Sequence, residues 1–431
     1  MTADLLYSET ERDLAAALTD LLADQADPAG VIARTERPDT YDTKLWRTVA
    51  AEIGIAGLLI PEALGGAGAS YRELATAAEQ FGAFAAPIPY LGSAAVATAV
   101  LLSVARSAAE NGAAGGPGSG DEAGFGSASS GPAAAVRAAQ LREAARADAT
   151  PGARQGSVSP AAALLRQLAD GSLTAALAVS TATRSATPFP ALARVAGHGD
   201  AAGTVKLRGT IPAVADALPA DVLLVPADGV PSALYLVEAN APGVHRTPLV
   251  SLDMTRQLCD ITLDDAPARP VAVGPAAAAA LSAGLAAGAA VLAAEQLGLA
   301  QHCLDLTIAY VRERRQFARQ IGSFEAVKHR LADLWATIAQ ARAASRYAAA
   351  CLADGDPDAP VAVALAKSAC CDVAVTAAQE CVQLHGGIGF TWEHPAHLFL
   401  KRAKAASVAF GTPGAHRSDL AALVDLPAPD A

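Results

Sequence analysis

The sequence predicts an α+β protein that is mostly α-helical, with helices at both ends of the chain and strands between them. Three observations lead to this prediction. Helical periodicity dominates residues 1–102, alternating apolar and polar residues appear within 160–273, and helical patterns return over 274–431. Alanine, a strong helix former, supplies most of the 52% hydrophobic content. Since one hydrophobic core rarely serves more than about 300 residues, we expect two or three packed units in this 431-residue chain.

The first unit, residues 1–102, is expected to be a helical domain. Ser8 followed by Glu11 fits a capping box at the start of a helix. Leu14, Leu18 and Leu22 then recur at helical spacing. A loop rich in proline and glycine over 60–68 separates this region from the next helical pattern, which begins near Tyr71.

Residues 103–159 differ sharply in composition from the rest of the chain. Glycine, alanine and serine dominate, and large apolar residues are almost absent. Such a segment buries too little surface to offset the entropy lost on ordering. We therefore expect a disordered insertion here, with a lid or a docking arm as the functional alternatives.

Residues 160–273 are expected to hold the end of the helical domain followed by a β-domain. Val222–Val225 and Leu234–Val237 are short apolar runs bounded by Asp, Gly or Pro. Cys259, Ile261 and Leu263 alternate with polar residues, which is typical of a half-buried strand.

The last unit, residues 274–431, is expected to be a helical bundle. Four helical patterns cover 276–314, a segment from about Ser323, 361–384 and 397–409, and glycines at 386, 387 and 389 interrupt the series. The very apolar run 276–294 consists mainly of Ala and Gly, which favours a buried helix over a membrane span.

The amino-acid composition argues against several classes of function and against some cellular locations. The net charge of −11 argues against a nucleic-acid binder, which needs a basic surface. Six cysteines without a CxxC pair are typical of reduced, buried thiols, and the N-terminus lacks a signal-like pattern, so we expect a cytoplasmic protein without membrane insertion. His394 and His397 have no third ligand at suitable spacing, so no metal site is expected.

Four motifs, taken in order along the chain, resemble those of the acyl-CoA dehydrogenase family. They are Ile60–Gly68, Ser251–Arg256, Tyr310–Asp333 and Gln383–Thr391. The resemblance covers nearly the whole chain outside the insertion. It implies the acyl-CoA dehydrogenase fold: an N-terminal helical domain, a central β-domain and a C-terminal four-helix bundle. It also implies FAD as cofactor, an acyl-CoA thioester as substrate and an electron-transferring flavoprotein as electron acceptor.

The resemblance assigns roles to two of these motifs. It implies that Arg314, Gln316 and Phe317 meet the FAD of a partner subunit, and that the Gln383, Gly386 and Gly387 loop touches the dinucleotide. An arginine fork suits a pyrophosphate, and glycine allows close backbone approach. Without the resemblance, Arg314 and Arg315 would be interpreted as a solvated helix end that complements the helix dipole.

The sequence departs from the family where the chemistry takes place. The family's catalytic glutamate, which removes the α-proton, falls at Phe410, and the alternative position used by some members falls at Gly288. The nearest acid on that helix, Glu295, lies roughly 10 Å further along the axis. The β-domain loop 179–186 lacks the family's Thr-Glu-Pro pattern, although Ser180 or Thr181 remain candidates for hydrogen bonds to the flavin. Ala213 stands where an aromatic residue commonly packs on the flavin.

Three hypotheses follow. The chain is a base-less subunit that completes the FAD site of a related glutamate-bearing subunit, an arrangement often used in the family for bulky acyl-CoA thioesters such as sterol side chains. Alternatively, it is a self-sufficient enzyme whose base lies elsewhere, with His416 and Asp419 as candidates. The third hypothesis is a flavin-free structural protein on the same fold.

Overall fold

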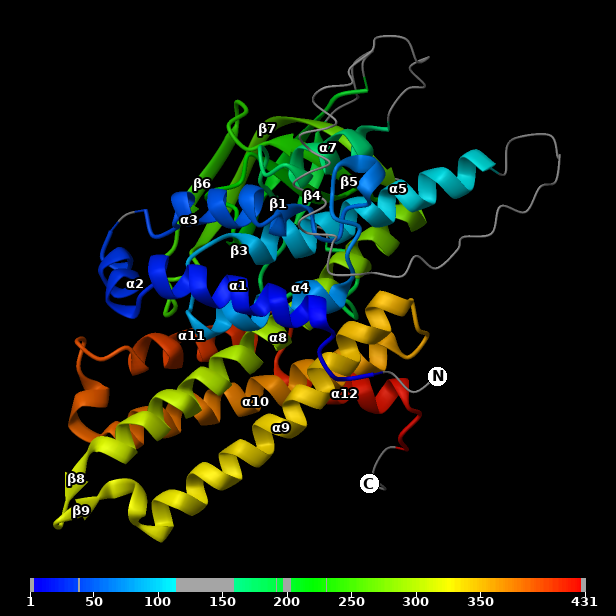
Figure 1. The fold of residues 1–431 in the computed structure, drawn as a ribbon. Coiled ribbons are helices and arrows are strands. Elements are labelled where there is room, and N and C mark those ends of the chain that lie inside the picture. The colour runs from blue at the N-terminus through cyan, green and yellow to red at the C-terminus, as the bar shows by residue number, and fades with distance from the viewer. Residues whose placement is uncertain are drawn as a thin grey trace, which may run out of the picture.

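A computed structural model describes residues 4–37, 39–113, 159–190, 192–196, 203–229 and 231–427. N-terminal helices lie between a β-sheet and a bundle of long C-terminal helices (Figure 1). The expected order of helices, strands and helices is therefore confirmed.

The N-terminal region is helical. Its α-helices are α1 (Glu9–Gln25), α2 (Pro28–Thr35), α3 (Thr43–Arg47), α4 (Tyr71–Ala83), α5 (Thr98–Ala113) and α7 (Pro160–Ala169). Short π and 3-10 turns, η1 (Thr48–Glu52), η2 (Ile55–Gly57), η3 (Glu62–Leu64) and η4 (Leu91–Ala97), connect them. The capping box is confirmed, because the Glu11 amide donates to Ser8 Oγ at 3.1 Å and the Ser8 amide donates to the Glu11 carboxylate at 2.6 Å.

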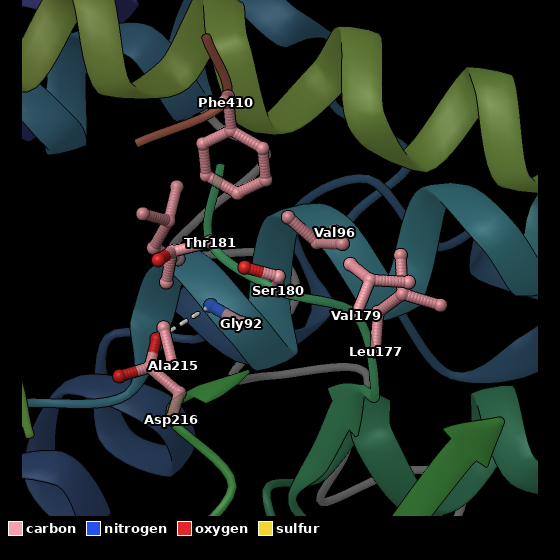
Figure 2. Close-up of a pocket in the computed structure, with 10 residues that line it drawn as sticks. Gly92, Val96, Leu177, Val179, Ser180, Thr181, Ala215, Asp216 and Phe410 are labelled. Carbon is pink, nitrogen blue, oxygen red and sulfur yellow. Dashed lines mark hydrogen bonds between the residues drawn. The ribbon is translucent and has the colours of Figure 1, made fainter. Parts of the chain in front are cut away.

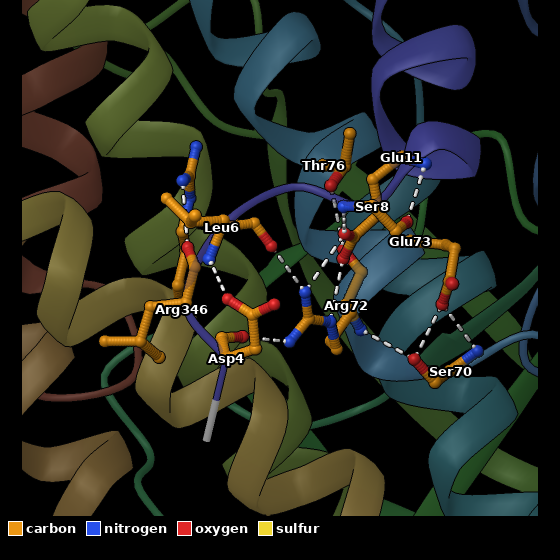
Figure 3. A network of polar contacts seen from close by, with 10 residues as sticks. Asp4, Leu6, Ser8, Glu11, Ser70, Arg72, Glu73, Thr76 and Arg346 are labelled. Atoms are coloured by element: carbon orange, nitrogen blue, oxygen red, sulfur yellow. Dashed lines mark hydrogen bonds and ion pairs between the residues drawn. The ribbon is translucent and has the colours of Figure 1, made fainter. Parts of the chain in front are cut away.

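The chain before α1 is tied to two different helices (Figure 3). Arg72 on α4 donates to the carbonyl oxygens of Asp4 and Leu6 and pairs with Glu11. Arg346, on a C-terminal helix, donates to the Leu5 carbonyl oxygen at 3.0 Å. The N-terminal segment therefore joins the first helical region to the C-terminal bundle.

The structure differs from the expectation at the start of the insertion. Residues 103–113 continue helix α5, because Leu101 and Val104 are buried and α5 packs against α7. Tertiary packing of this kind stabilises a helix beyond its own propensity. The remainder of the predicted insertion, up to residue 158, lies outside the described residues.

The β-domain is a sheet whose pairings close on themselves in the order β4–β5–β7–β3–β2–β4. Its strands are β1 (Ala175–Leu177), β2 (Ala193–Ala196), β3 (Val205–Ala215), β4 (Val222–Asp228), β5 (Ala233–Glu238), β6 (Val244–Pro248) and β7 (Leu258–Val273). Antiparallel β3 and β7 share the longest register, which is interrupted between Ile211 and Val214. This irregularity displaces Ala213 from the regular ladder.

The C-terminal region consists of long packed helices. They are α8 (Gly274–Glu313), α9 (Glu325–Asp354), α10 (Ala359–His385), α11 (Ala396–Val408) and α12 (Pro413–Leu423), with the 3-10 turns η5 (Ile321–Ser323) and η6 (Gly386–Phe390). Strands β8 (Arg315–Gln316) and β9 (Arg319–Gln320) form a hairpin between α8 and α9. Helix α8 contacts α4, α5, α9 and α10, and so joins the N-terminal helices to the bundle.

Three helical segments are long and apolar enough to cross a membrane by length and composition: Leu91–Glu110, α8 and Ala359–Phe390. In each, about three fifths or more of the most apolar window is buried inside the protein. Their apolar character therefore has an explanation in internal packing, while the absence of membrane insertion stays a prediction.

Candidate functional site

Phe410 lies in the loop between α11 and α12, and its backbone is held from two sides. Its amide donates to the Thr181 carbonyl oxygen at 2.6 Å, and its own carbonyl oxygen accepts from His416 Nε2 at 2.8 Å. The backbone of Phe410 adopts a left-handed conformation, with φ of +54°. Such a conformation is strained for a bulky residue, so the loop geometry is imposed by its surroundings.

The Phe410 ring packs against Gly288 on α8. A Cβ atom added to Gly288 would lie 2.8 Å from two ring carbons, which is closer than side chains tolerate. The two positions to which the resemblance assigns the catalytic glutamate are therefore in direct contact. Neither position carries an acid in this chain.

The two β-domain features that differ from the family pattern, the loop containing Thr181 and the residue Ala213, lie beside Phe410. The Thr181 amide donates to the Ala213 carbonyl oxygen at 3.0 Å, while the Thr181 carbonyl accepts from Phe410. The Ala213 amide in turn donates to the Asp260 carboxylate at 2.9 Å. The three unusual features of the sequence therefore form one connected structure.

A small cavity remains beside Phe410 (Figure 2). Its volume is about 30 Å³, and it is lined by Leu91, Gly92, Val96, Leu177, Val179, Ser180, Thr181, Ala215, Asp216 and Phe410. A cavity of this size accommodates one or two waters.

The one acid among these lining residues, Asp216, is already hydrogen-bonded. Its carboxylate accepts from the Tyr41 hydroxyl at 2.6 Å and from the Gly92 amide at 2.8 Å. A carboxylate fixed by two donors orients η4 and β3 but is poorly placed to exchange protons with a ligand.

Glu295 lies further along α8 at the centre of a buried charge network. Its carboxylate pairs with Arg256 at 2.6 Å and with Arg402 at 2.8 Å, and it accepts from the Tyr90 hydroxyl. Burial acts to raise the pKa of Glu295, but the charges of Arg256 and Arg402 outweigh it and lower this pKa to about 2. A carboxylate so strongly stabilised as an anion is a poor general base.

The other two candidate bases are also committed to structural contacts. Asp419 pairs with Arg184 at 2.7 Å, which ties α12 to the β-domain. His416 Nε2 lies 2.8 Å from the Phe410 carbonyl oxygen, and burial acts to lower the pKa of this histidine. Both side chains hold the Phe410 loop in place.

The predicted cofactor-binding residues at the far end of the bundle are exposed. Arg314 caps the C-terminus of α8, Gln316 lies in β8, and Phe317 lies at the hairpin tip with 86% of its surface exposed. Phe317 and Ala318 both have left-handed backbones, with φ of +49° and +59°. A strained hairpin with an exposed aromatic tip is typical of a binding element.

The hairpin carries cations that are free to bind an anion. Arg319 lies 3.7 Å above the Phe324 ring, but no described residue forms an ion pair with Arg314 or Arg315. Gly386 and Gly387 have open space around the position of a Cβ, and Gly386 has a φ of +64°. These features fit the pyrophosphate and backbone contacts of a dinucleotide.

The two predicted motifs are linked by a contact between residues of the motifs themselves, which the sequence did not predict. Tyr310, in the last turn of α8, stacks on His385, which precedes Gly386, with ring centroids 4.4 Å apart. His385 also lies 4.3 Å from the His394 ring. The sequence places Tyr310 and His385 in these motifs but carries no signal of their stacking, because the two residues lie far apart along the chain.

Comparison with known proteins agrees with this architecture. Residues 8–111 match the family model described as "Acyl-CoA dehydrogenase, N-terminal domain", and residues 278–424 match "Acyl-CoA dehydrogenase, C-terminal domain". The chain is 30% identical over 406 residues to acyl-CoA dehydrogenase IpdE2 of Mycobacterium tuberculosis, covering 94% of each protein.

Two solved structures of two-component assemblies are also similar. The ChsE4–ChsE5 complex of Mycobacterium tuberculosis contains a chain with 25% identity and a TM-score of 0.74, covering 99% of this chain and 100% of that one. A variant of the Tcur3481–Tcur3483 steroid acyl-CoA dehydrogenase contains a chain with 26% identity and a TM-score of 0.74, covering 97% and 98%. By sequence and fold together, the chain belongs to the acyl-CoA dehydrogenases, FAD-dependent oxidoreductases that act on the CH–CH bond of acyl-CoA thioesters.

Proposed function

We propose that this chain is the base-less subunit of a heteromeric acyl-CoA dehydrogenase and that it completes the FAD site of a related, glutamate-bearing subunit. The observation that carries the proposal is the contact between Phe410 and Gly288. The proposal is supported because the two positions where the resemblance expects a base hold Phe410 and Gly288, with a cavity of about 30 Å³ beside the ring.

The exposed arginines and glycines at the far end of the bundle support the same proposal. Arg314 and Arg315 have no ion-pair partner among the described residues, and Gly386 and Gly387 leave open space. A purely structural protein has little use for unpaired arginines beside strained, exposed backbone. The similarity to chains of the ChsE4–ChsE5 and Tcur3481–Tcur3483 assemblies gives the two-component arrangement a precedent.

In this arrangement the chain binds and orients the cofactor. Arg314 would hold the pyrophosphate, Gln316 and Gln383 would donate amide hydrogen bonds, and Phe317 would supply an apolar wall. When bound, FAD would supply the hydride acceptor. The partner subunit would supply the glutamate that removes the α-proton, and an electron-transferring flavoprotein would accept the electrons from the complex.

Sterol-derived acyl-CoA thioesters are the proposed substrate class. The similar Tcur3481–Tcur3483 structure is described as a steroid acyl-CoA dehydrogenase. We also propose that the complex works in the cytoplasm, without nucleic acid or metal.

The test is a visible spectrum and an acyl-CoA oxidation assay on the chain alone and co-expressed with a related glutamate-bearing chain. Flavin bands and oxidation are expected only in the co-expressed sample. In that sample, Arg314→Ala is expected to reduce bound flavin, while Arg12→Ala, at an exposed arginine on α1, leaves it unchanged. A chain that is yellow and active by itself overturns the proposal, and the absence of flavin in both samples favours a structural role.

A further inference from the structure

Three aromatic side chains, which we call the ring cluster, meet where α8 and α10 end and α11 begins. Tyr310 lies in the last turn of α8, His385 is the last residue of α10, and His394 lies two residues before Ala396, where α11 begins. His385 contacts both other rings, with centroids 4.4 Å from Tyr310 and 4.3 Å from His394. The ring cluster therefore joins the ends of three helices.

Hydrogen bonds fix the orientation of the two histidine rings. His385 Nδ1 lies 2.7 Å from the Cys381 carbonyl oxygen, and since a carbonyl only accepts, this nitrogen carries a proton. His394 Nδ1 accepts from the Ala396 amide at 3.2 Å, so this nitrogen is unprotonated and the ring is neutral. Burial, together with the neighbouring His385, also lowers the pKa of His394. Each ring is therefore held by the backbone of its own helix.

The turn that carries His394 is also attached to α11 through Trp392. The Trp392 ring meets the His397 ring edge-on, with centroids 4.6 Å apart, and Lys401 Nζ lies 3.9 Å from the Trp392 ring centroid. Both contacts come from the first two turns of α11. Residues before and after His394 therefore bind to the same helix, which limits the movement of this ring.

The ring cluster connects directly to the two motifs that are predicted to bind a dinucleotide. On one side, the Arg314 amide donates to the Tyr310 carbonyl oxygen at 2.9 Å, so the start of the hairpin is bonded to the turn that carries the Tyr310 ring. On the other side, His385 directly precedes Gly386. The stacking of Tyr310 on His385 therefore links Arg314 to the glycine loop through short, defined contacts.

From this geometry we propose that Tyr310, His385 and His394 are positioning residues, whose rings fix the Arg314 hairpin relative to the Gly386–Gly387 loop so that both motifs meet one dinucleotide. The inference rests on the proposed function, because it assigns both motifs to the same FAD. Fixing the two motifs in advance avoids the entropy cost of ordering them on binding. Loss of one aromatic pair corresponds to about a three- to tenfold change in an equilibrium constant.

The first test measures the affinity for FAD of the co-expressed complex after flavin depletion, by flavin fluorescence. Tyr310→Leu, which removes the ring, is expected to raise the Kd about three- to tenfold. Tyr310→Phe, which keeps the ring, should stay within about twofold of the wild-type value. The matched control is Tyr347→Leu at a half-buried tyrosine on α9, roughly 30 Å along that helix from the end that follows the hairpin, and it should also stay within that limit.

The second test needs no flavin and uses hydrogen–deuterium exchange of the chain alone. Tyr310→Leu lies on α8, but it is expected to speed exchange of residues 386–394 about three- to tenfold, because those residues lose the ring that holds His385. Exchange in α12 should be unchanged and serves as the internal reference. Tyr310→Phe should restore the wild-type exchange, which a general loss of packing at this position would not explain.

Arg314→Ala in the same complex separates this inference from the proposed function. If Arg314→Ala weakens FAD binding while Tyr310→Leu behaves like Tyr310→Phe, the ring cluster does not position the motifs and this inference alone is overturned. Faster exchange confined to α8 in Tyr310→Leu overturns it as well. If Arg314→Ala leaves the Kd unchanged, the proposed function is wrong and the inference fails with it. Circular dichroism establishes that each variant is folded.

Discussion

The buried network around Glu295 allows a quantitative prediction for Glu295→Gln. The folded protein lowers the pKa of Glu295 from 4.5 to about 2. At about 1.4 kcal/mol for each pKa unit, the ionised carboxylate contributes about 3 kcal/mol to stability at neutral pH. Because the substitution also leaves Arg256 and Arg402 buried without their shared counter-charge, we expect a loss of about 3–5 kcal/mol.

The lowered pKa of Glu295 also determines how the stability loss in Glu295→Gln varies with pH. A depressed carboxyl pKa stabilises the folded state fully above the unfolded-state value, and that contribution is lost as the pH falls through the folded-state value. The stability difference between the wild-type chain and Glu295→Gln should therefore be largest above about pH 5 and shrink as the pH approaches 2. Urea denaturation followed by far-ultraviolet circular dichroism at several pH values measures this difference.

A matched control uses an exposed ion pair. Arg417 and Asp372 pair at 2.8 Å with more than half of each side chain exposed, so Asp372→Asn should change stability by less than about 1 kcal/mol. If Glu295→Gln unfolds at the wild-type urea concentration, the buried network does not stabilise the fold as argued. If the variant folds normally but abolishes α-proton abstraction in the assembled complex, Glu295 is a catalytic base and the proposed function is wrong.

Three further predictions follow from the Phe410 loop and the N-terminal segment. Gly288→Ala should destabilise the chain by about 1–3 kcal/mol through overpacking against Phe410 and Val96. A Phe410→Ala background should reduce this cost without removing it, because Val96 Cγ2 would still lie 2.9 Å from the added Cβ, and a double-mutant cycle in urea measures the reduction. Phe410→Gly should be more stable than Phe410→Ala by about 1 kcal/mol, because glycine relieves the left-handed backbone, whereas equal urea midpoints would mean that the backbone carries no strain. Arg72→Met should increase proteolysis before α1, because this arginine holds two carbonyl oxygens of the N-terminal segment; an unchanged cleavage rate would show that Arg346 alone suffices.

The long helices and the strands could be predicted from the sequence because their signals are local. The expected helix at 276–314 corresponds to α8 at Gly274–Glu313, and the alternation around Ile261 lies within β7. The β8–β9 hairpin was not predicted, because its tip residues Phe317 and Ala318 are not the Asn and Gly that mark such turns. The helical extension of α5 was missed because packing against α7 overrides the weak local composition.

The sequence named residues of the candidate site but not their interactions. The resemblance assigned the family's base to Phe410 and, for some members, to Gly288, and the contact between these two residues is seen in the structure. Nothing local to the sequence shows that Arg256, Glu295 and Arg402 form one cluster, since they come from the β6–β7 loop, α8 and α11. Long-range partners of buried charges depend on the assembled fold, and only the structure supplies them.

The left-handed backbone of Phe410 is the most informative detail of the candidate site. If this loop had simply lost a function, a glycine at position 410 would remove the strain of the left-handed backbone, which costs about 1–2 kcal/mol. The chain instead carries a large aromatic ring whose burial against Gly288 and Val96 offsets that strain. The loop therefore keeps the backbone geometry that directs a side chain toward α8, and the side chain fills the space. At the other end of the bundle, strained backbone at Phe317 and Ala318 leaves the Phe317 ring exposed, with an edge-on contact to Phe324 among the described residues. In the proposed two-subunit arrangement, burial of this ring against the partner would offset the strain, as burial of the Phe410 ring does within the chain.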